Sequence, residues 1–303
     1  KLKIFKSFQK TVKSSKFILT FDPVAAIELL NKNYSFADRT VAKEIKKTPW
    51  QAKPNIDNTS WVYNDIPDHG YKILSENEVA KVLFEKICDE VLIYTKRKSK
   101  IGLLLSGGMD SRMVAGALDY LIKKKQLKDV VVTGITWGND NSRDVVYAKT
   151  ISERLGWDWK HYKVGAKEFI QNIEETAIHG CEYSPLHLHA IPQIRDDNKW
   201  DVILGGSYGD SIGRAEYGSV NVENVKSLSS GFYNIASLVN DETFVDNLPK
   251  IEEDLIKYHK LFPREKLYMQ NELDYQIHYM RRMLNPCMEL LNEKAELHQI
   301  FTH

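Results

Sequence analysis

The sequence has little cysteine and no long apolar segment. Its 303 residues include three cysteines, Cys88, Cys181 and Cys287, which are far apart and odd in number. This argues against a disulfide framework and indicates reduced thiols, as in a cytoplasmic protein. No apolar run approaches the roughly 20 residues that a membrane-spanning helix needs. We therefore expect a soluble, cytoplasmic protein without a membrane partner.

The sequence also lacks an excess of charge of either sign. Lys and Arg number 42 and Asp and Glu number 41, which gives a formal net charge of +1. This balance provides no general electrostatic attraction for nucleic acid, so nucleic acid is not expected as a partner. Two common phosphate-binding patterns are absent: the G-x-x-x-x-G-K-S/T loop and the dinucleotide fingerprint G-x-G-x-x-G.

The chain does contain a glycine turn between an apolar strand and a helix, within Ile101 to Leu118. From Met109 onward, apolar residues recur at helical spacings of three and four. A buried strand, a glycine turn and a helix N-terminus together present backbone N–H groups to an anion. Asp110 is placed to hold a cation against that anion. The alternative interpretation is an ordinary strand-to-helix turn.

Strands and helices alternate along the middle of the chain. Strand patterns at 101–105, 130–137, 157–164 and 201–204 are separated by helical patterns. This alternation predicts an α/β fold with a doubly wound parallel sheet. A second glycine loop, Gly205 to Asp210, directly follows the last of these strands. Both loops are expected at the carboxyl ends of strands, where such sheets bind ligands.

Strand patterns fade from about residue 222, and we predict helices over 241–260, 263–283 and 286–300. The sequence therefore divides into three segments. These are an amino-terminal segment, an α/β domain and a helical subdomain, at 1–70, 71–221 and 222–303.

The turn from Ser106 to Ser111, S-G-G-M-D-S, resembles the pyrophosphate loop of the ATP pyrophosphatase superfamily. With Thr136-Trp137, the D-x-x-x-A pattern from Asp144 to Ala148 and the second glycine loop, it is similar to the synthetase domain of the asparagine synthetase family and its relative β-lactam synthetase. The resemblance implies an adenine nucleotide α-hydrolase-like sheet that uses ATP and Mg²⁺. It also implies that 1–70 is the end of, or the linker from, a glutaminase-type domain.

The resemblance implies roles for individual residues. Asp110 and Asp210 would bind Mg²⁺ and act as catalytic residues. Arg112 would join them if it reaches a phosphate, and the alternative is a solvated arginine in the first helical turn. The nucleotide would contact the two loops and two strands through Leu104, Ser106, Gly107, Gly108, Asp110, Ser111, Ile135, Thr136, Gly205 and Gly206.

Three departures from the family pattern are visible. Ser207 stands where asparagine synthetases carry a glutamate, and Tyr208 lies beside it. The earliest cysteine, Cys88, falls in a predicted helix, so a glutaminase would be a separate domain or subunit. The family also continues into a helical segment with a lysine beyond the position of His303.

The function predicted from this resemblance is an ATP-dependent, adenylate-forming amide ligase or amidotransferase of the asparagine synthetase type. A small carboxylate would be activated as acyl-AMP with release of pyrophosphate, and ammonia or an amine would then displace AMP. Oligomers are compatible with the sequence. One alternative is another ATP pyrophosphatase that modifies tRNA or a nucleotide, and a second is a degenerate nucleotide-binding module without catalysis.

Other candidate residues give weaker signals. A zinc site is one interpretation of a short cluster, but packed or surface histidines are favoured for His179, Cys181, His187 and His189. Glu182 is a speculative acid or base. Packing onto the core is favoured over ligand stacking for Trp50, Trp61 and Tyr63.

Overall fold

The computed structural model describes residues 2–16, 18–66, 73–209, 228 and 230–302. The chain divides into two compact units, each assembled from three stretches of sequence. The sheet unit consists of Gly70–Ile170, Leu188–Gly218 and Met288–His303. The helical unit consists of Lys1–His69, Gln171–His187 and Ser219–Cys287. The division into 1–70, 71–221 and 222–303 was drawn from the sequence pattern and from the resemblance to domains of other proteins. It stays a prediction.

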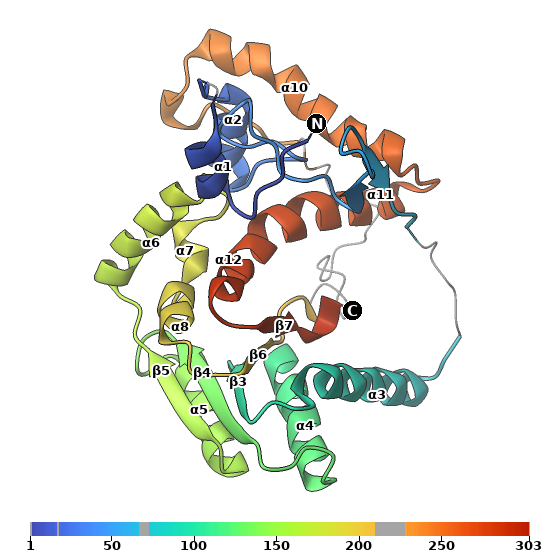
Figure 1. Cartoon of the computed structure of the whole chain (residues 1–303), viewed down its shortest axis with the longest axis vertical. Helices are drawn as coiled ribbons and strands as arrows, with labels where there is room; N and C mark the ends of the chain where they lie inside the picture. Colours follow the sequence, from blue (N-terminus) through green and yellow to red (C-terminus); the bar gives the residue numbers. More distant parts are fainter. Residues whose placement is uncertain (1, 17, 67–72, 210–227, 229, 303) are drawn as a thin grey trace. The chain divides into compact units, whose positions relative to one another are not determined.

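Five parallel strands form the centre of the sheet unit (Figure 1). In chain order they are β3 (Lys100–Leu104), β4 (Val131–Trp137), β5 (Asp158–Tyr162), β6 (Val202–Gly205) and β7 (Leu297–Gln299). Their order in the sheet is β5-β4-β3-β6-β7. The chain therefore builds outward from β3 in one direction and then returns to build on its other side. This is the doubly wound topology, and the predicted fold class is confirmed.

The two central strands are continuous apolar runs because both of their faces are covered. Ile101 to Leu104 of β3 and Val202 to Gly205 of β6 are buried. Helices cover both faces of a parallel sheet, so its inner strands do not show the alternation of apolar and polar residues. The sequence prediction of these two strands is confirmed.

One strand was not predicted. We expected a helix over 286–300, but Leu297–Gln299 instead pairs with β6 as the edge strand β7. The prediction was wrong because three residues are too few to show a strand period. The hydrogen bonds that define this strand come from a partner about 90 residues earlier in the sequence, so local patterns do not reveal it.

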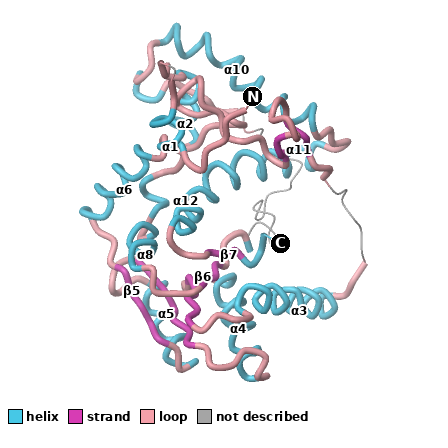
Figure 2. The backbone as a smooth tube through the Cα atoms, in the orientation of Figure 1, coloured by secondary structure: helices cyan, strands magenta, loops and turns pink. Residues whose placement is uncertain are grey.

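Helices lie around the sheet (Figure 2), and capping residues set the ends of several of them. Ser75 and Glu78 form a capping box at the start of α3, and α5 ends at Gly156 with a left-handed φ of 68°. The helical elements that lie wholly within this unit are α3 (Glu76–Thr95), α4 (Met109–Lys123), α5 (Arg143–Leu155), α8 (Ile191–Asp197) and the short 3-10 helices η4 (Leu290–Glu293) and η5 (Ile300–Thr302).

The helical unit packs its elements around two apolar clusters. One joins Ile27 of α2 to Leu255 of α10, and the other surrounds Tyr258 and Phe262. Trp50 and Tyr63 pack against the second cluster, as predicted. The elements are α1 (Phe8–Ser14), α2 (Pro23–Lys32), β1 (Ala52–Pro54), β2 (Trp61–Tyr63), η2 (Ile235–Ser237), α10 (Asp241–Leu261), α11 (Leu267–Asp274) and η3 (Tyr275–Leu284). Three helices begin in one unit and end in the other: α6 (Ala166–Ile178), α7 (Pro185–Leu188) and α12 (Asn285–Glu289).

The predicted helix over 263–283 includes a π-helical stretch, η3, that binds the amino-terminal part of the helical unit. Ala37 N–H donates to Nδ1 of His278 at 2.9 Å. The guanidinium groups of Arg281 and Arg282 both donate to the carbonyl oxygen of Ala37, at 3.1 and 2.8 Å. Arg282 also donates to the carbonyl oxygen of Arg39 at 2.7 Å. Two consecutive arginines thus satisfy the backbone of one segment.

None of the helices in the described part of the chain combines the length and apolar character that crossing a membrane requires.

Candidate active site at the carboxyl edge of the sheet

The two glycine loops lie against each other because β3 and β6 are paired neighbours. A Cβ atom on Gly206 would lie 2.8 Å from the backbone nitrogen of Ser111 in the first turn of α4. A Cβ atom on Gly209 would lie 2.7 Å from Oδ1 of Asp110. Only glycine permits so close an approach, so the second loop packs directly on the start of α4. The strand order reverses between these two strands, which is where doubly wound sheets bind ligands.

Serine hydroxyls hold the first loop in shape. Ser106 N–H donates to Oγ of Ser111 at 3.1 Å, and Gly108 N–H donates to Oγ of Ser106, also at 3.1 Å. Gly108 is the N-cap of α4, and no side chain caps this helix end. The positive end of the α4 dipole is therefore left for an anion, whereas Ser75 and Glu78 close the start of α3.

A carboxylate from the next helix binds the middle of the first loop. Gly107 N–H donates to Oδ1 of Asp144, in the first turn of α5, at 2.9 Å. The ring of Tyr147, one turn later, covers the same glycine: a Cβ atom on Gly107 would lie 2.6 Å from its Cδ2. The D-x-x-x-A pattern singled out in the sequence therefore places its aspartate on the loop. The sequence did not indicate this contact.

The predicted adenine side of the site is the end of β4. Ile135 is paired with Leu104 across the sheet, and both are buried. Oγ1 of Thr136 donates to the carbonyl oxygen of Leu105 at 2.6 Å, which ties the end of β4 to the start of the first loop. These three predicted nucleotide-binding positions therefore lie next to the glycine turn. Their contacts with a nucleotide stay a prediction.

The three predicted catalytic residues differ in what the structure shows. Asp110 is half-buried in the first turn of α4, beside Gly209. Arg112 is exposed, and its Nε donates to the carbonyl oxygen of Gly108 at 3.1 Å. This bond turns the guanidinium back toward its own helix. Asp210, the second predicted magnesium ligand, lies outside the described residues.

Gln299 is a residue of this edge that sequence reasoning missed. It ends β7 opposite Gly205, and its Oε1 accepts a hydrogen bond from Ser207 N–H at 3.1 Å. Tyr208, next in the loop, is buried and has a left-handed φ of 74°. A side chain other than glycine in this conformation is strained, and such strain is concentrated at functional sites.

Gly205 to Gly209 also reads G-x-S-x-G, the pattern of the hydrolase nucleophile elbow. In an elbow the serine itself occupies the strained turn. Here the left-handed φ belongs to Tyr208, and the backbone N–H of Ser207 is engaged by Gln299. The geometry of an elbow is therefore not met.

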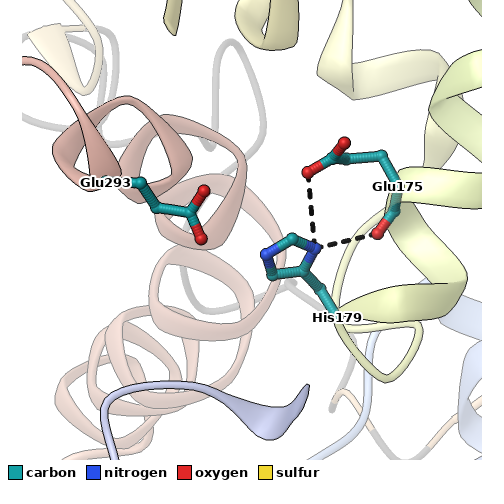
Figure 3. Close-up of side chains that lie close together, drawn as sticks. All are labelled: Glu175, His179 and Glu293. Carbon is teal, nitrogen blue, oxygen red and sulfur yellow. Dashed lines mark hydrogen bonds and ion pairs between the residues drawn. The ribbon is translucent and has the colours of Figure 1, made fainter. Parts of the chain in front are cut away.

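The four residues of the zinc interpretation are divided between the units. His179 directly follows α6, with its Nδ1 2.9 Å from the carbonyl oxygen of Glu175 and 3.7 Å from Oε1 of the same residue (Figure 3). His189 belongs to the sheet unit, where it stacks on Trp137 with ring centroids 5.6 Å apart. These contacts favour packed histidines over a shared metal site. Glu293, also drawn in Figure 3, belongs to the sheet unit.

Glu182 lies in the helical unit among cations. Its Oε2 is 2.9 Å from Nζ of Lys47, and its Oε1 is 3.9 Å from a guanidinium nitrogen of Arg282. Burial alone would raise the pKa of this carboxyl, but the charges of Lys47 and Arg282 hold it below its ordinary value. An acid or base poised for proton transfer would need the opposite shift. Glu182 therefore fits a structural ion pair.

Two solved structures resemble parts of the chain. One is a U34-tRNA thiolase from Methanococcus maripaludis, at 16% identity and a TM-score of 0.31, covering 71% of this chain and 77% of the thiolase. The other is an NH3-dependent NAD synthetase from Campylobacter jejuni, at 19% identity and a TM-score of 0.33, covering 71% of this chain and 92% of the synthetase.

Sequence comparison is more specific. The family model described as asparagine synthase matches residues 87–212. The glutamine-hydrolysing asparagine synthetases of Gallus gallus and Homo sapiens are 32% identical over 107 residues and 31% identical over 109 residues. Each match covers 35% of this chain and 18% of the relative. The resemblance that the glycine loops indicated is therefore confirmed: residues 87–212 are an asparagine synthase-like segment.

Proposed function

We propose that this protein is an ATP-dependent, adenylate-forming amide ligase of the asparagine synthetase type. The observation that supports it most is the packing of the second glycine loop on the first turn of α4, at the reversal of strand order. A carboxylate oxygen of the substrate would attack the α-phosphorus of ATP, and the bond to pyrophosphate would break. The nitrogen of ammonia or an amine would then attack the acyl carbon, release AMP and lose a proton.

The first loop suits the pyrophosphate part of ATP. The start of α4 has no side-chain cap, and Ser106 and Ser111 keep the backbone of the turn in one conformation. Donors that are fixed before the ligand binds lose little entropy on binding and can stabilise charge that develops in the transition state. Asp144 would keep Gly107 in place through the bond to its N–H.

The residues present also suit a magnesium ion. Asp110 supplies an oxygen ligand next to the proposed pyrophosphate cradle, and Asp210 is proposed as the second carboxylate. Mg²⁺ takes one or two protein carboxylates together with phosphate oxygens and water, so two aspartates are sufficient. The ion would neutralise negative charge on the phosphates. Ile135 and Thr136 are proposed to contact adenine from the end of β4.

The match covers less than a fifth of each glutamine-hydrolysing relative, so the source of nitrogen is part of the proposal. We propose ammonia or an amine as the acceptor, delivered freely or by a separate glutaminase domain or subunit. Ser207 stands at the position of the family glutamate. We therefore propose a small carboxylate as the acyl substrate and do not restrict it to aspartate.

The test is the nucleotide product. The protein is incubated with Mg²⁺, ATP and ammonia, with or without aspartate and other small carboxylates, and pyrophosphate and phosphate are measured separately. We expect pyrophosphate that depends on one carboxylate. Asp110→Asn should abolish it, while Asp119→Asn, later in α4 and paired with Lys123, should not. Phosphate release, or full activity of Asp110→Asn, would contradict the proposal.

A further inference from the structure

One buried hydrogen-bond donor at the carboxyl edge of the sheet has no partner. Gln299 is 7% exposed, and its Nε2 makes no hydrogen bond within the described part of the chain. Leaving a buried N–H group unpaired costs free energy that a partner would recover. Native structures keep few such groups, and each calls for an explanation such as a functional role.

The backbone fixes the orientation of this carboxamide. Ser207 N–H lies 3.1 Å from Oε1 of Gln299, and a backbone N–H group only donates. The oxygen must therefore face Ser207, since an amide rotated by 180° would bring two donors together. The amino group is consequently the unpaired branch.

Gly205 and Gln299 are matched to each other. A Cβ atom on Gly205 would lie 2.8 Å from Cδ and 2.9 Å from Nε2 of Gln299. Any other residue at this position would displace the carboxamide. The bare backbone at the end of β6 thus allows an amide donor to lie across it. The next residue, Gly206, packs on the first turn of α4, where the anion cradle is expected.

We propose that Nε2 of Gln299 donates a hydrogen bond to a phosphate oxygen of ATP bound at the two glycine loops. A donor to an oxyanion makes a charge-assisted bond, which is stronger than a bond between neutral groups. The same side chain holds the backbone of Ser207 through its oxygen. Gln299 therefore links the position of the second loop to the presence of phosphate. The inference rests on the proposed function for the identity of the nucleotide.

Two variants separate the two roles of the carboxamide. Gln299→Glu keeps an acceptor for Ser207 N–H but removes the amino group and adds negative charge. Gln299→Met has a similar length and neither donates nor accepts strongly. Gln126→Glu makes the same chemical change at an exposed position just beyond the carboxyl end of α4, and it is the control. Circular dichroism and thermal melting verify that each variant is folded.

The measurement is calorimetric binding of MgATP and, separately, of magnesium pyrophosphate to the whole protein. A lost bond to a charged group predicts that MgATP affinity falls roughly ten- to a hundredfold in both variants and not in Gln126→Glu. An equal loss for pyrophosphate would place the contact on the β- or γ-phosphate, and a loss for MgATP alone would place it on the α-phosphate.

A folded Gln299→Glu that binds MgATP as tightly as the wild type would overturn the inference, because the acceptor role alone would then explain the residue. If Gln299→Glu does not fold, the affinity of Gln299→Met for MgATP decides the question in the same way. Wild-type protein that binds MgATP but releases no pyrophosphate with any carboxylate would refute the proposed function and leave the inference to be decided by the variants. Wild-type protein that does not bind MgATP would overturn both.

Discussion

The two units of this chain use buried polar groups in opposite ways. In the helical unit charged side chains pair with each other: Arg281 donates to Asp38 at 3.0 Å, and Arg282 lies beside Glu182. At the carboxyl edge of the sheet the donors are backbone N–H groups and one carboxamide, positioned by glycines and serine hydroxyls. The first arrangement satisfies its charges within the chain, and the second leaves the amino group of Gln299 without a partner among the described residues.

This difference shows which buried polar groups indicate function. Glu182 attracts attention in the sequence because a lone glutamate before a predicted helix could be catalytic. In the structure its charge is balanced, so it is weak support for a site. Gln299 has no such signal in the sequence, yet its donor has no partner beside the glycine loops within the described residues. A missing partner is more informative here than a charge.

The largest effect on stability is expected from breaking the ion pairs of the helical unit. Arg282 is fully buried, and Arg282→Met would remove one of the cations near Glu182 and the donor to the Arg39 carbonyl oxygen. Removing one partner of a buried charge pair costs about 3–5 kcal/mol. Urea denaturation would measure this loss, with the exposed Arg154→Met as control. A loss below about 1 kcal/mol would mean that these charges contribute little to stability.

The next effect is a dependence of stability on pH in the same unit. Burial raises the pKa of Glu28 from 4.5 to about 8, and its Oε2 accepts a hydrogen bond from Phe36 N–H. The folded protein therefore binds one more proton than the unfolded chain between these values. The contribution of Glu28 to stability is fully present below pH 4.5 and is lost as pH rises toward 8. It amounts to a few kcal/mol, at about 1.4 kcal/mol for each unit of pKa difference.

Glu28→Gln keeps an acceptor for Phe36 N–H and removes this titration. As pH rises from 5 to 8, its free energy of unfolding should fall less than that of the wild type, while the exposed Glu85→Gln should keep the wild-type slope. Burial lowers the pKa of His278 well below 6.5, which reduces stability as pH falls below 6.5. That effect is shared by all three proteins and cancels in the comparison. Equal slopes for Glu28→Gln and wild type would contradict the assignment.

A third prediction concerns the glycine packing of the site. Gly206→Ala would place a methyl group 2.8–2.9 Å from backbone atoms of Asp110 and Ser111. The backbone of a helical turn cannot move aside as the end of a flexible side chain can. Misplacing reacting groups by about 1 Å costs roughly a hundredfold in rate, so we expect that loss in carboxylate-dependent pyrophosphate release. The control is Gly116→Ala in the interior of α4, where the methyl group meets no atom within 4 Å. It should keep activity and stabilise the protein by about 0.5–1 kcal/mol.

The smallest effect is expected at Asp144. Asp144→Ala removes the acceptor of Gly107 N–H, and one hydrogen bond is worth about 0.5–1.5 kcal/mol, so the KM for MgATP should rise roughly three- to tenfold. Asp144→Asn retains an oxygen at the same place and should change KM less. Initial rates at varied MgATP give both values. If the two variants behave alike, the charge of Asp144 matters rather than its bond to the loop.

Local patterns were sufficient to predict the centre of the sheet unit. The strand at Ile101, the turn at Gly107 and the helix from Met109 are contiguous, so apolar period and glycine placement specify them together. The neighbouring loop at Gly205 was found in the same way. That the two loops meet followed from the general rule for parallel sheets, because both turns end strands.

Contacts between distant parts of the chain were not predictable. Gly107 and Asp144 are 37 residues apart, and Ser207 and Gln299 are 92 apart, so neither bond leaves a mark in local sequence. The strand β7 was not predicted for the same reason, because it pairs with a strand that is distant in the sequence. The region around Arg281 was predicted to be helical, but local sequence did not reveal its π-helical form or its bond to Ala37, which lies 244 residues away.

The most direct test of the central claim is exchange of labelled pyrophosphate into ATP. An enzyme that forms an acyl-adenylate reversibly incorporates the label only when Mg²⁺ and the carboxylate are both present, and no amine is needed. We predict carboxylate-dependent exchange by the wild-type protein and none by Asp110→Asn. Exchange that ignores the carboxylate, or ATP cleaved to ADP and phosphate instead, would contradict adenylation at these loops.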